Sequence, residues 1–376
     1  MFRFVHAADL HLDTPFVGIG RVAPGVAQRL RDASLEAFDN LIGLAIDREA
    51  AFLLLAGDLY DGPERGIRAQ LRFLRGVERL GERGITVFVV HGNHDPLDGW
   101  SAIRTPPPNL VIFGSQVEHR TVERDGRRLA TVYGISYPRG DVTGNLSLRF
   151  QRQSWDGLHI GLLHCTLGAQ PDHAPYSPCS RVDLERAGMD YWALGHVHRR
   201  QALEGRPWIV YPGNLQSRGA RAGERGAKGA VVVTAEPAAI AQVDFVALDC
   251  VRHAEVEIDI TELNGLDALQ KETIEAVVAE VANQQNRDLL VQVTLCGRGS
   301  LHDDLSREGV PAGLLQDLRE RLEESQPMIW VDCILDQTLG ALDLDAIARR
   351  GDFSSELMRT SAALGADRTA MESLMA

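Results

Sequence analysis

The chain has 376 residues, of which 44% are hydrophobic, and a formal net charge of −13 from 39 Lys and Arg against 52 Asp and Glu. This length favours two domains over one, and no apolar run approaches the roughly 20 residues that cross a bilayer. The N-terminus lacks the layout of a signal peptide, and five cysteines without a CxxC pair argue against a disulfide scaffold, so we expect a cytoplasmic protein without membrane association.

The first 248 residues alternate short apolar runs with longer amphipathic segments. Runs of four to seven residues rich in branched and aromatic side chains suit strands that are buried on both faces. Such runs cover residues 2–8, 51–56, 85–90, 158–163 and 191–194, with further strand-like runs at 208–211, 230–233 and 243–248. Helical spacing of apolar residues predicts helices over 27–49 and 67–83. This alternation predicts an α/β domain.

The charge changes abruptly after residue 248. Residues 1–248 contain 28 basic and 27 acidic residues, whereas residues 249–376 contain 11 basic and 25 acidic residues, a net of −14. The patterns in the acidic part predict strands at 256–260, 289–295 and 328–335, helices at about 266–286 and 312–324, and a helical tail. We therefore predict a catalytic domain over 1–248, an α+β accessory domain over 249–340 and a helical tail over 341–376.

One segment of the first part is strongly basic. Residues 199–228 contain seven Arg and Lys against two Glu. A solvated loop and a phosphate-binding segment are both consistent with such a run.

Polar residues that could bind metal ions or act in catalysis follow five of the predicted strands. They are Asp9 and His11, then Asp58 and Asp61, then Asn93, His94 and Asp95, then His164, and finally His196 and His198. Open α/β sheets bind ligands outside the carboxyl ends of their strands. Each fragment alone is common as a cap or surface feature. Five of them in order predict one set of ligands.

The ligand types indicate which cations this set would hold. Mixed Asp, His and Asn ligands without cysteine suit Mn²⁺, Fe²⁺ or Zn²⁺ better than Ca²⁺ or a single Mg²⁺. The ligands also exceed what one ion can use, whereas two ions about 3.5–4 Å apart that share a carboxylate would use them all. We therefore predict two divalent cations, Mn²⁺ in first place, and hydrolysis of phosphoesters.

The motifs D-x-H, G-D-x-x-D, G-N-H-D, a lone His and G-H-x-H, in this order, resemble the calcineurin-like metallophosphoesterase superfamily over residues 1–248. The stretches 5–13, 191–196 and 211–214 are similar to SbcD-like bacterial DNA-repair exonucleases, in the branch typified by YhaO. The resemblance implies a four-layer α/β/β/α fold, in which helices flank a two-sheet β-sandwich, with a smaller C-terminal α+β cap domain.

The resemblance also implies roles for the motif residues. One metal would be held by Asp9, His11 and His198, the other by Asn93, His164 and His196, and Asp58 would bridge them. His94 would be the catalytic histidine, which stabilises the transition state or protonates the leaving oxygen. Asp95 would orient His94, and Asp61 would hold a ligand or a water. From the basic segment, the candidates for binding substrate are Arg218, Arg221, Arg225 and Lys228.

The expected function is that of a two-metal DNA exonuclease or phosphodiesterase in DNA repair. A phosphodiesterase or phosphatase that acts on nucleotides or other small esters is the alternative, because the motifs describe the metal centre and not the substrate groove. A third possibility is an adaptor that docks an SMC-like coiled-coil ATPase through its tail, whose apolar residues at 342–364 would otherwise pack on their own domain. DNA, such an ATPase and a second copy of the chain are the expected partners.

Overall fold

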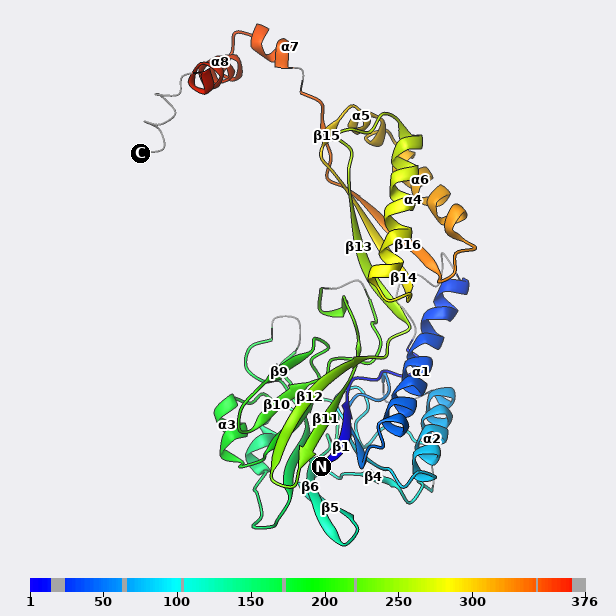
Figure 1. The fold of residues 1–376 in the computed structure, drawn as a ribbon, viewed down its shortest axis with the longest axis vertical. Coiled ribbons are helices and arrows are strands. Elements are labelled where there is room, and N and C mark those ends of the chain that lie inside the picture. Colours follow the sequence, from blue (N-terminus) through cyan, green and yellow to red (C-terminus); the bar gives the residue numbers. More distant parts are fainter. Residues whose placement is uncertain are drawn as a thin grey trace. The chain divides into compact units, whose positions relative to one another are not determined.

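The computed structural model describes residues 1–14, 24–62, 66–102, 105–170, 174–219, 222–342 and 344–366 (Figure 1). The chain forms two compact units. The first comprises Met1–Ala254 and Gln284–Leu289, and the second comprises Glu255–Asn283 and Leu290–Ala376. The first unit thus runs past residue 248 and takes in a short segment from later in the chain.

Strands dominate the first unit. In chain order its elements are β1 (Phe2–Ala7), α1 (Pro24–Asp47), β2 (Phe52–Ala56), α2 (Ile67–Gly81), β3 (Thr86–Val90), β4 (Leu110–Ile112), β5 (Glu118–Arg124), β6 (Arg127–Ile135), the 3₁₀ turn η1 (Leu146–Arg149), β7 (Leu158–His164), α3 (Arg181–Arg186), β8 (Tyr191–Gly195), β9 (Gln201–Leu203), β10 (Trp208–Tyr211), the 3₁₀ turn η2 (Ala222–Glu224), β11 (Gly229–Glu236) and β12 (Ala239–Ala247).

These strands form two six-stranded sheets, ordered β12-β11-β1-β2-β3-β4 and β5-β6-β7-β8-β10-β9. In the first sheet, β1, β2, β3 and β4 run parallel, and in the second β6, β7, β8 and β10 run parallel. The carboxyl ends of the central strands therefore gather at one edge of each sheet.

Three apolar layers separate the sheets and helices. Between the sheets, Phe52 and Phe88 of the first sheet meet Ile160 and Tyr191 of the second. Outside the first sheet, the opposite strand faces pack against α1 and α2, and outside the second sheet the faces pack against η1 and α3. This arrangement confirms the predicted α/β/β/α sandwich, because alternate residues of each central strand are buried on opposite faces.

The second unit is built around a three-stranded sheet of order β13-β14-β16. Its elements are α4 (Leu266–Asn283), β14 (Asp288–Cys296), β15 (Arg298–Gly299), α5 (Leu301–Leu305), α6 (Val310–Leu322), β16 (Ile329–Asp336), β17 (Leu339–Gly340), α7 (Leu344–Arg349) and α8 (Phe353–Ala366), preceded by β13 (Val251–Asp259), which begins in the first unit. In β13, Val256 and Ile258 are buried, whereas Glu255 and Glu257 are exposed. One face of this strand is therefore covered, and its other face carries acidic side chains.

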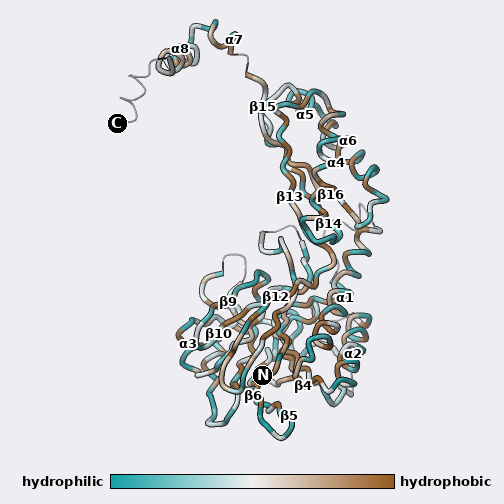
Figure 2. The backbone as a smooth tube through the Cα atoms, viewed as in Figure 1, coloured by the Kyte–Doolittle hydropathy of each residue, from teal (hydrophilic) through white to brown (hydrophobic). Residues whose placement is uncertain are grey.

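Hydropathy follows this burial along the chain (Figure 2). The apolar colour is concentrated on the central strands, while α7 and α8 alternate apolar and polar residues. Within the described ranges, no helix combines the length and the apolar character that a bilayer crossing requires.

Candidate metal centre

The polar residues predicted as ligands lie where the parallel strands of both sheets end. Asp9 and His11 follow β1, Asp58 follows β2, and Asn93 follows β3. On the second sheet, β7 ends at His164, and the segment after β8 carries His196 and His198. The two sheets thus contribute ligands to one place.

Several of these residues have a left-handed backbone. The angle φ is 51° at Asp9, 42° at His11, 51° at Asp58 and 98° at His196. Residues other than glycine seldom adopt such angles unless the surrounding structure holds them there. Here the Asp9 amide donates to the Gly57 carbonyl at 3.1 Å, and the His11 amide donates to the Asp58 carbonyl at 3.0 Å. The turn after β1 is therefore bonded to the turn after β2.

Two glycines allow the chain to close around the site. A Cβ on Gly195 would lie 1.9 Å from the carbonyl oxygen of Ala56, and a Cβ on Gly92 would lie 2.3 Å from Asp58 Oδ1. Neither separation can accommodate a carbon atom. Glycine is therefore required at position 195 for the two sheets to approach each other this closely, and at position 92 to leave room for the Asp58 carboxylate.

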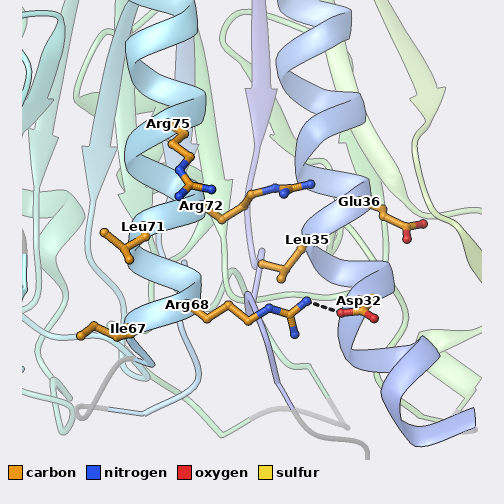
Figure 3. Close-up of a pocket in the computed structure, with 8 residues that line it drawn as sticks. All are labelled: Asp32, Leu35, Glu36, Ile67, Arg68, Leu71, Arg72 and Arg75. Atoms are coloured by element: carbon orange, nitrogen blue, oxygen red, sulfur yellow. Dashed lines mark hydrogen bonds and ion pairs between the residues drawn. The ribbon is translucent and has the colours of Figure 1, made fainter. Parts of the chain in front are cut away.

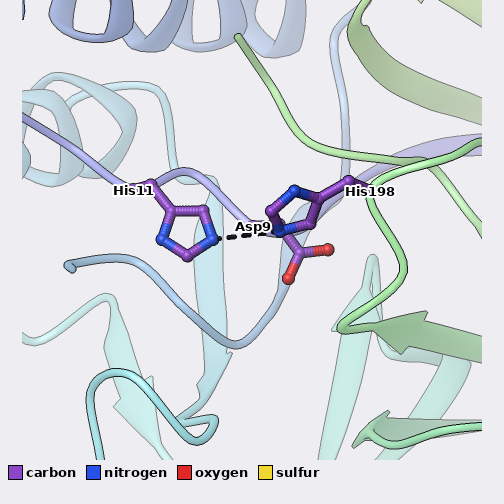
Figure 4. Close-up of side chains that lie close together, drawn as sticks. All are labelled: Asp9, His11 and His198. Carbon is purple, nitrogen blue, oxygen red and sulfur yellow. Dashed lines mark hydrogen bonds between the residues drawn. The ribbon is translucent and has the colours of Figure 1, made fainter. Parts of the chain in front are cut away.

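The first ligand group consists of Asp9, His11 and His198 (Figure 4). One possible ligand atom from each lies within 4.8 Å of the others, and His11 Nε2 is 3.3 Å from His198 Nε2. On its far side, His198 Nδ1 lies 2.5 Å from Glu224 Oε1. An Nδ1 proton donated to that carboxylate leaves the Nε2 lone pair facing His11. Two facing imidazole nitrogens beside a buried carboxylate suit a divalent cation.

The second group consists of Asp58, His164 and His196. His164 Nε2 lies 3.4 Å from Asp58 Oδ2 and 3.0 Å from Asn93 Oδ1. His164 Nδ1 is 2.8 Å from the carbonyl oxygen of Ala56, so that the Nε2 lone pair is directed into the site. The four residues predicted for this side of the centre thus lie together.

Asp58 lies between the two groups. Its Oδ2 is 3.4 Å from His164 Nε2 and 4.0 Å from His11 Nε2. Its Oδ1 accepts a hydrogen bond from the amide of His94 at 3.0 Å. This placement agrees with the bridging role that the resemblance implies, because one carboxylate reaches a histidine of each group.

Burial shapes the electrostatics of the cluster. Burial raises the pKa of Asp9 to about 6 and lowers the pKa of His11 to about 4. Burial also acts to raise the pKa of Asp58, but His164 and His11 outweigh it and hold that pKa below its ordinary range. Burial lowers the pKa of His164, yet Asp58 and Asp9 outweigh it and raise that pKa to about 9. Buried carboxylates grouped with histidines fit divalent cations, which would neutralise them.

His94 lies beside both groups and is held by Asp61. His94 Nδ1 is 2.8 Å from Asp61 Oδ1, and Asp61 Oδ2 accepts a hydrogen bond of 2.7 Å from Arg218 Nη2. The hydrogen bond to Asp61 raises the pKa of His94 above its ordinary value. Asp61 Oδ1 is also 3.6 Å from His11 Nδ1. Asp61 therefore links Arg218, His94 and a ligand of the first group.

The prediction that Asp95 orients His94 is wrong, because Asp95 contacts other groups. Asp95 Oδ2 accepts from the Leu59 amide at 2.9 Å and lies 3.1 Å from His91 Nδ1, while its Oδ1 accepts from the Gly92 amide at 2.8 Å. Asp95 is fully buried and braces the turns after β2 and β3. It is Asp61 that holds the His94 ring.

The four basic residues predicted to bind substrate differ in position. Arg218 reaches the site through Asp61, and Arg225 is exposed. Lys228 is buried, and its Nζ donates to the carbonyls of His198 and Gly223 at 2.9 and 2.6 Å. Its position corresponds to a structural brace and not to a substrate contact. Arg221 lies outside the described residues.

Glu224 was not predicted as a site residue. It is one of only two acids in the basic 199–228 segment, which is the signal that could have drawn attention to it. Burial acts to raise the pKa of Glu224, but hydrogen bonding and charge from His198 hold it below the ordinary value.

A surface groove between α1 and α2 is separate from this centre (Figure 3). Its volume is about 440 Å³, and it is lined by Asp32, Leu35, Glu36, Ile67, Arg68, Leu71, Arg72 and Arg75. Arg68 pairs with Asp32, and Arg72 pairs with Asp39. The groove thus lies along an ion-paired contact between the two helices, and none of its lining residues is a predicted metal ligand.

Comparison with protein families gives two matches. The family described as Calcineurin-like phosphoesterase matches residues 2–200, which include every predicted metal ligand. The family described as Metallophosphoesterase YhaO, middle domain, matches residues 253–339.

Individual relatives come from bacteria and archaea. The uncharacterized metallophosphoesterase YhaO of Bacillus subtilis is 36% identical over 340 residues, which cover 89% of this chain and 81% of the relative. The DNA double-strand break repair protein Mre11 of Methanopyrus kandleri is 24% identical, over 93% of this chain and 76% of the relative. The Mre11 of Aeropyrum pernix is 28% identical, over 57% and 54%.

Proposed function

Because this chain belongs to the calcineurin-like phosphoesterase family, as its motifs predicted, we propose that it is a nuclease that hydrolyses DNA phosphodiester bonds with two divalent cations, Mn²⁺ in first place. Membership of the family makes the chain a metal-dependent phosphoesterase with a binuclear centre. DNA as substrate, exonuclease action and a role in DNA repair are the proposed part. Support comes from the Mre11 relatives, which are DNA double-strand break repair proteins by name.

The observation that carries the proposal is the continuity between the metal centre and the basic segment. Arg218 belongs to that segment and donates to Asp61, which in turn holds His94 next to the ligand groups. A phosphate backbone that followed the basic segment would therefore meet the metal centre. The side chain of Arg218 is 25% exposed and that of His94 is 40% exposed, so both are accessible from solvent.

The bound cations would polarise the phosphoryl group and lower the pKa of an attacking water. The residues of the chain position the substrate and donate a proton. Asp61 engages Nδ1 of His94, which leaves Nε2 to give its proton to the leaving oxygen. The raised pKa of His94 keeps that proton in place before the reaction. Arg218 would contact a non-bridging phosphate oxygen once the substrate competes for its guanidinium.

The test uses end-labelled single- and double-stranded DNA with Mn²⁺. We expect the wild-type chain to shorten linear DNA, Asp58→Ala to abolish cleavage, and His94→Ala to reduce the rate about 10²–10⁴-fold, the usual contribution of a positioned acid. Exposed Glu204 provides a matched control, and Glu204→Gln is expected to cleave at the wild-type rate.

A chromogenic phosphodiester and cyclic nucleotides are assayed in parallel. If the metal-loaded protein leaves all DNA ends intact but hydrolyses the small diesters, the nuclease proposal is wrong and the small-ester alternative replaces it.

We further propose that the C-terminal tail docks an SMC-like coiled-coil ATPase. In α8, the side chains of Phe353 and Leu357 are 81% and 58% exposed, which is unusual for large apolar residues in a helix without a partner. Deletion of residues 341–376 should leave diester hydrolysis intact and abolish co-purification with the ATPase. Unchanged co-purification would exclude the tail as the docking element.

A further inference from the structure

Glu224 lies behind the metal centre, in the turn η2, and is 8% exposed. Its Oε1 is 2.5 Å from His198 Nδ1. Its Oε2 accepts two hydrogen bonds, one from Asn214 Nδ2 at 2.7 Å and one from the amide of Arg218 at 3.0 Å. One buried carboxylate thus holds a predicted metal ligand, an asparagine and the backbone of an arginine.

The contact with His198 determines which ring nitrogen faces the site. Because Nδ1 donates its proton to Glu224, Nε2 keeps its lone pair and points at His11 Nε2, 3.3 Å away. Carboxylates that hold the far nitrogen of a ligating histidine fix its tautomer and ring orientation, and their loss typically costs 10- to 100-fold in metal affinity.

The contact with Arg218 extends the same carboxylate toward His94. Glu224 fixes the backbone of Arg218, whose guanidinium donates to Asp61, and Asp61 holds the His94 ring. The metal ligand and the proton donor are therefore both connected to one side chain.

Lys228 braces the turn that carries Glu224. Its Nζ donates to the carbonyls of His198 and Gly223, so the turn and the ligand segment are joined through their backbones as well. The amide of Lys228 in turn donates to Asp249 Oδ2 at 3.1 Å. Loss of the Glu224 carboxylate alone would therefore leave the turn attached, which makes its substitution a test of positioning.

We propose that Glu224 is a positioning residue that directs His198 Nε2 to a divalent cation and holds Arg218 in register with Asp61 and His94. The inference rests on the metal-dependent part of the proposed function and not on DNA being the substrate. It predicts that Glu224 acts on metal affinity through His198.

The experiment is calorimetric titration of the full-length, metal-free chain with Mn²⁺. Four proteins are compared with the wild type: Glu224→Gln, His198→Ala, the double variant with both changes, and Glu204→Gln as the matched exposed control. We expect two Mn²⁺ sites in the wild type and in Glu204→Gln. In Glu224→Gln, one site should weaken 10- to 100-fold. In the His198→Ala background, adding Glu224→Gln should weaken Mn²⁺ binding no further, because the residue acts through that histidine.

Two results would overturn the proposal: wild-type affinity at both sites in Glu224→Gln, or an equal additional loss in the His198→Ala background. If Glu224→Gln does not fold, Glu224→Asp takes its place, since it keeps the charge and withdraws the carboxylate by one carbon, and the same weakening of one site is expected. A wild-type chain that binds no Mn²⁺ would overturn metal dependence itself, whereas two-site binding without DNA cleavage would overturn only the choice of substrate.

Discussion

Two carboxylates predicted to support the metal centre, Asp61 and Asp95, have different tasks. Asp61 lies against His94, whereas Asp95 accepts hydrogen bonds from the turns that carry the ligands. The sequence offered no means to assign these tasks, because Asp95 is adjacent to His94 in the chain and Asp61 is adjacent only in space. The roles implied by the resemblance named Asp95, the neighbour of His94 in the chain, and this was the wrong residue.

Substitution separates the two tasks. Asp61→Asn should lower kcat for a chromogenic diester about 10- to 100-fold, because a neutral amide positions the His94 ring less firmly and stabilises its protonated form less. Asp95→Asn should instead lower the free energy of unfolding by about 1–3 kcal/mol, the cost of an impaired buried acceptor. Steady-state kinetics and urea unfolding of both variants provide the measurement. A larger fall in kcat for folded Asp95→Asn than for Asp61→Asn would restore Asp95 as the partner of His94.

His6 gives the fold a dependence on pH. It is fully buried between the sheets with Nδ1 3.1 Å from the Tyr191 hydroxyl, and burial lowers its pKa to about 3 from 6.5. Between these two pH values His6 is protonated in the unfolded chain and neutral in the folded chain. Its contribution to the free energy of unfolding is therefore fully present above pH 6.5 and is lost as the pH falls toward 3. Lowering the pH from 7 to 5 should therefore reduce the equilibrium constant for folding about 25-fold, which lowers the free energy of unfolding by roughly 2 kcal/mol.

His6→Gln cannot take up that proton and keeps a hydrogen-bonding group for Tyr191. Urea unfolding of the two proteins in EDTA, at pH 7 and at pH 5, should show a smaller loss of stability for the variant. Equal losses would show that His6 is not the source of the effect.

At the scale of elements, the sequence allowed prediction of the strands that are buried on both faces. The predicted runs at 51–56 and 191–194 correspond to β2 and β8, because continuous apolar stretches can only be central strands in this kind of sheet. The hairpin of β5 and β6 was not predicted. Its first strand, Glu118–Arg124, is mostly charged and exposed, so a search for apolar runs does not find it. The hairpin signal was present in the turn, because Asp125 and Gly126 join the paired residues Arg124 and Arg127 with φ of 54° and 70°.

The position of the ligands was predictable for the same reason, since strand ends in a parallel sheet share an edge. Asp61 and Arg218 were also named as site residues, but their contacts with each other and with His94 were not predicted, and Glu224 was missed, because each reaches the site from a loop or a short turn. Loop conformation depends on hydrogen bonds to distant elements, which periodicity does not report.

The junction of β8 with the first sheet leads to a further prediction. A methyl group on Gly195 would meet the Ala56 carbonyl at 1.9 Å and His164 Nδ1 at 2.9 Å. Gly195→Ala should therefore force the sheets apart and lower the free energy of unfolding by about 1–3 kcal/mol. Gly144→Ala, where nothing lies within 4 Å of the added carbon, is the control and should leave stability within about 0.5 kcal/mol. Chemical denaturation of both variants gives the comparison, and equal stabilities would contradict the close approach.

At the scale of the whole molecule, the net charge of −13 conceals an uneven distribution. Residues 249–376 carry a net of −14, so the catalytic part is nearly neutral. Any attraction for a phosphate backbone must then come from the bound cations and from local arginines such as Arg218.

Removal of the metal ions should lower the free energy of unfolding of the protein. Buried Asp9 and Asp58 repel each other without cations, so Mn²⁺ at 100 times its dissociation constant should raise the free energy of unfolding by about 2.7 kcal/mol. Thermal unfolding in Mn²⁺ and in EDTA provides the measurement. Identical melting temperatures would mean that the cluster binds no cation in the folded state.

The first ligand group also constrains how the molecule assembles. His11 and His198 are separated by 187 positions in sequence and follow strands of different sheets, β1 and β8. A nascent or collapsed chain cannot present both, so the cation has nothing to bind until the sandwich has closed. Mn²⁺ should consequently leave the refolding rate nearly unchanged and slow the unfolding rate, since its contacts are absent from the transition state. The metal centre would thus form late in folding, and the rate at which it loses its cations would set the rate at which the folded enzyme unfolds.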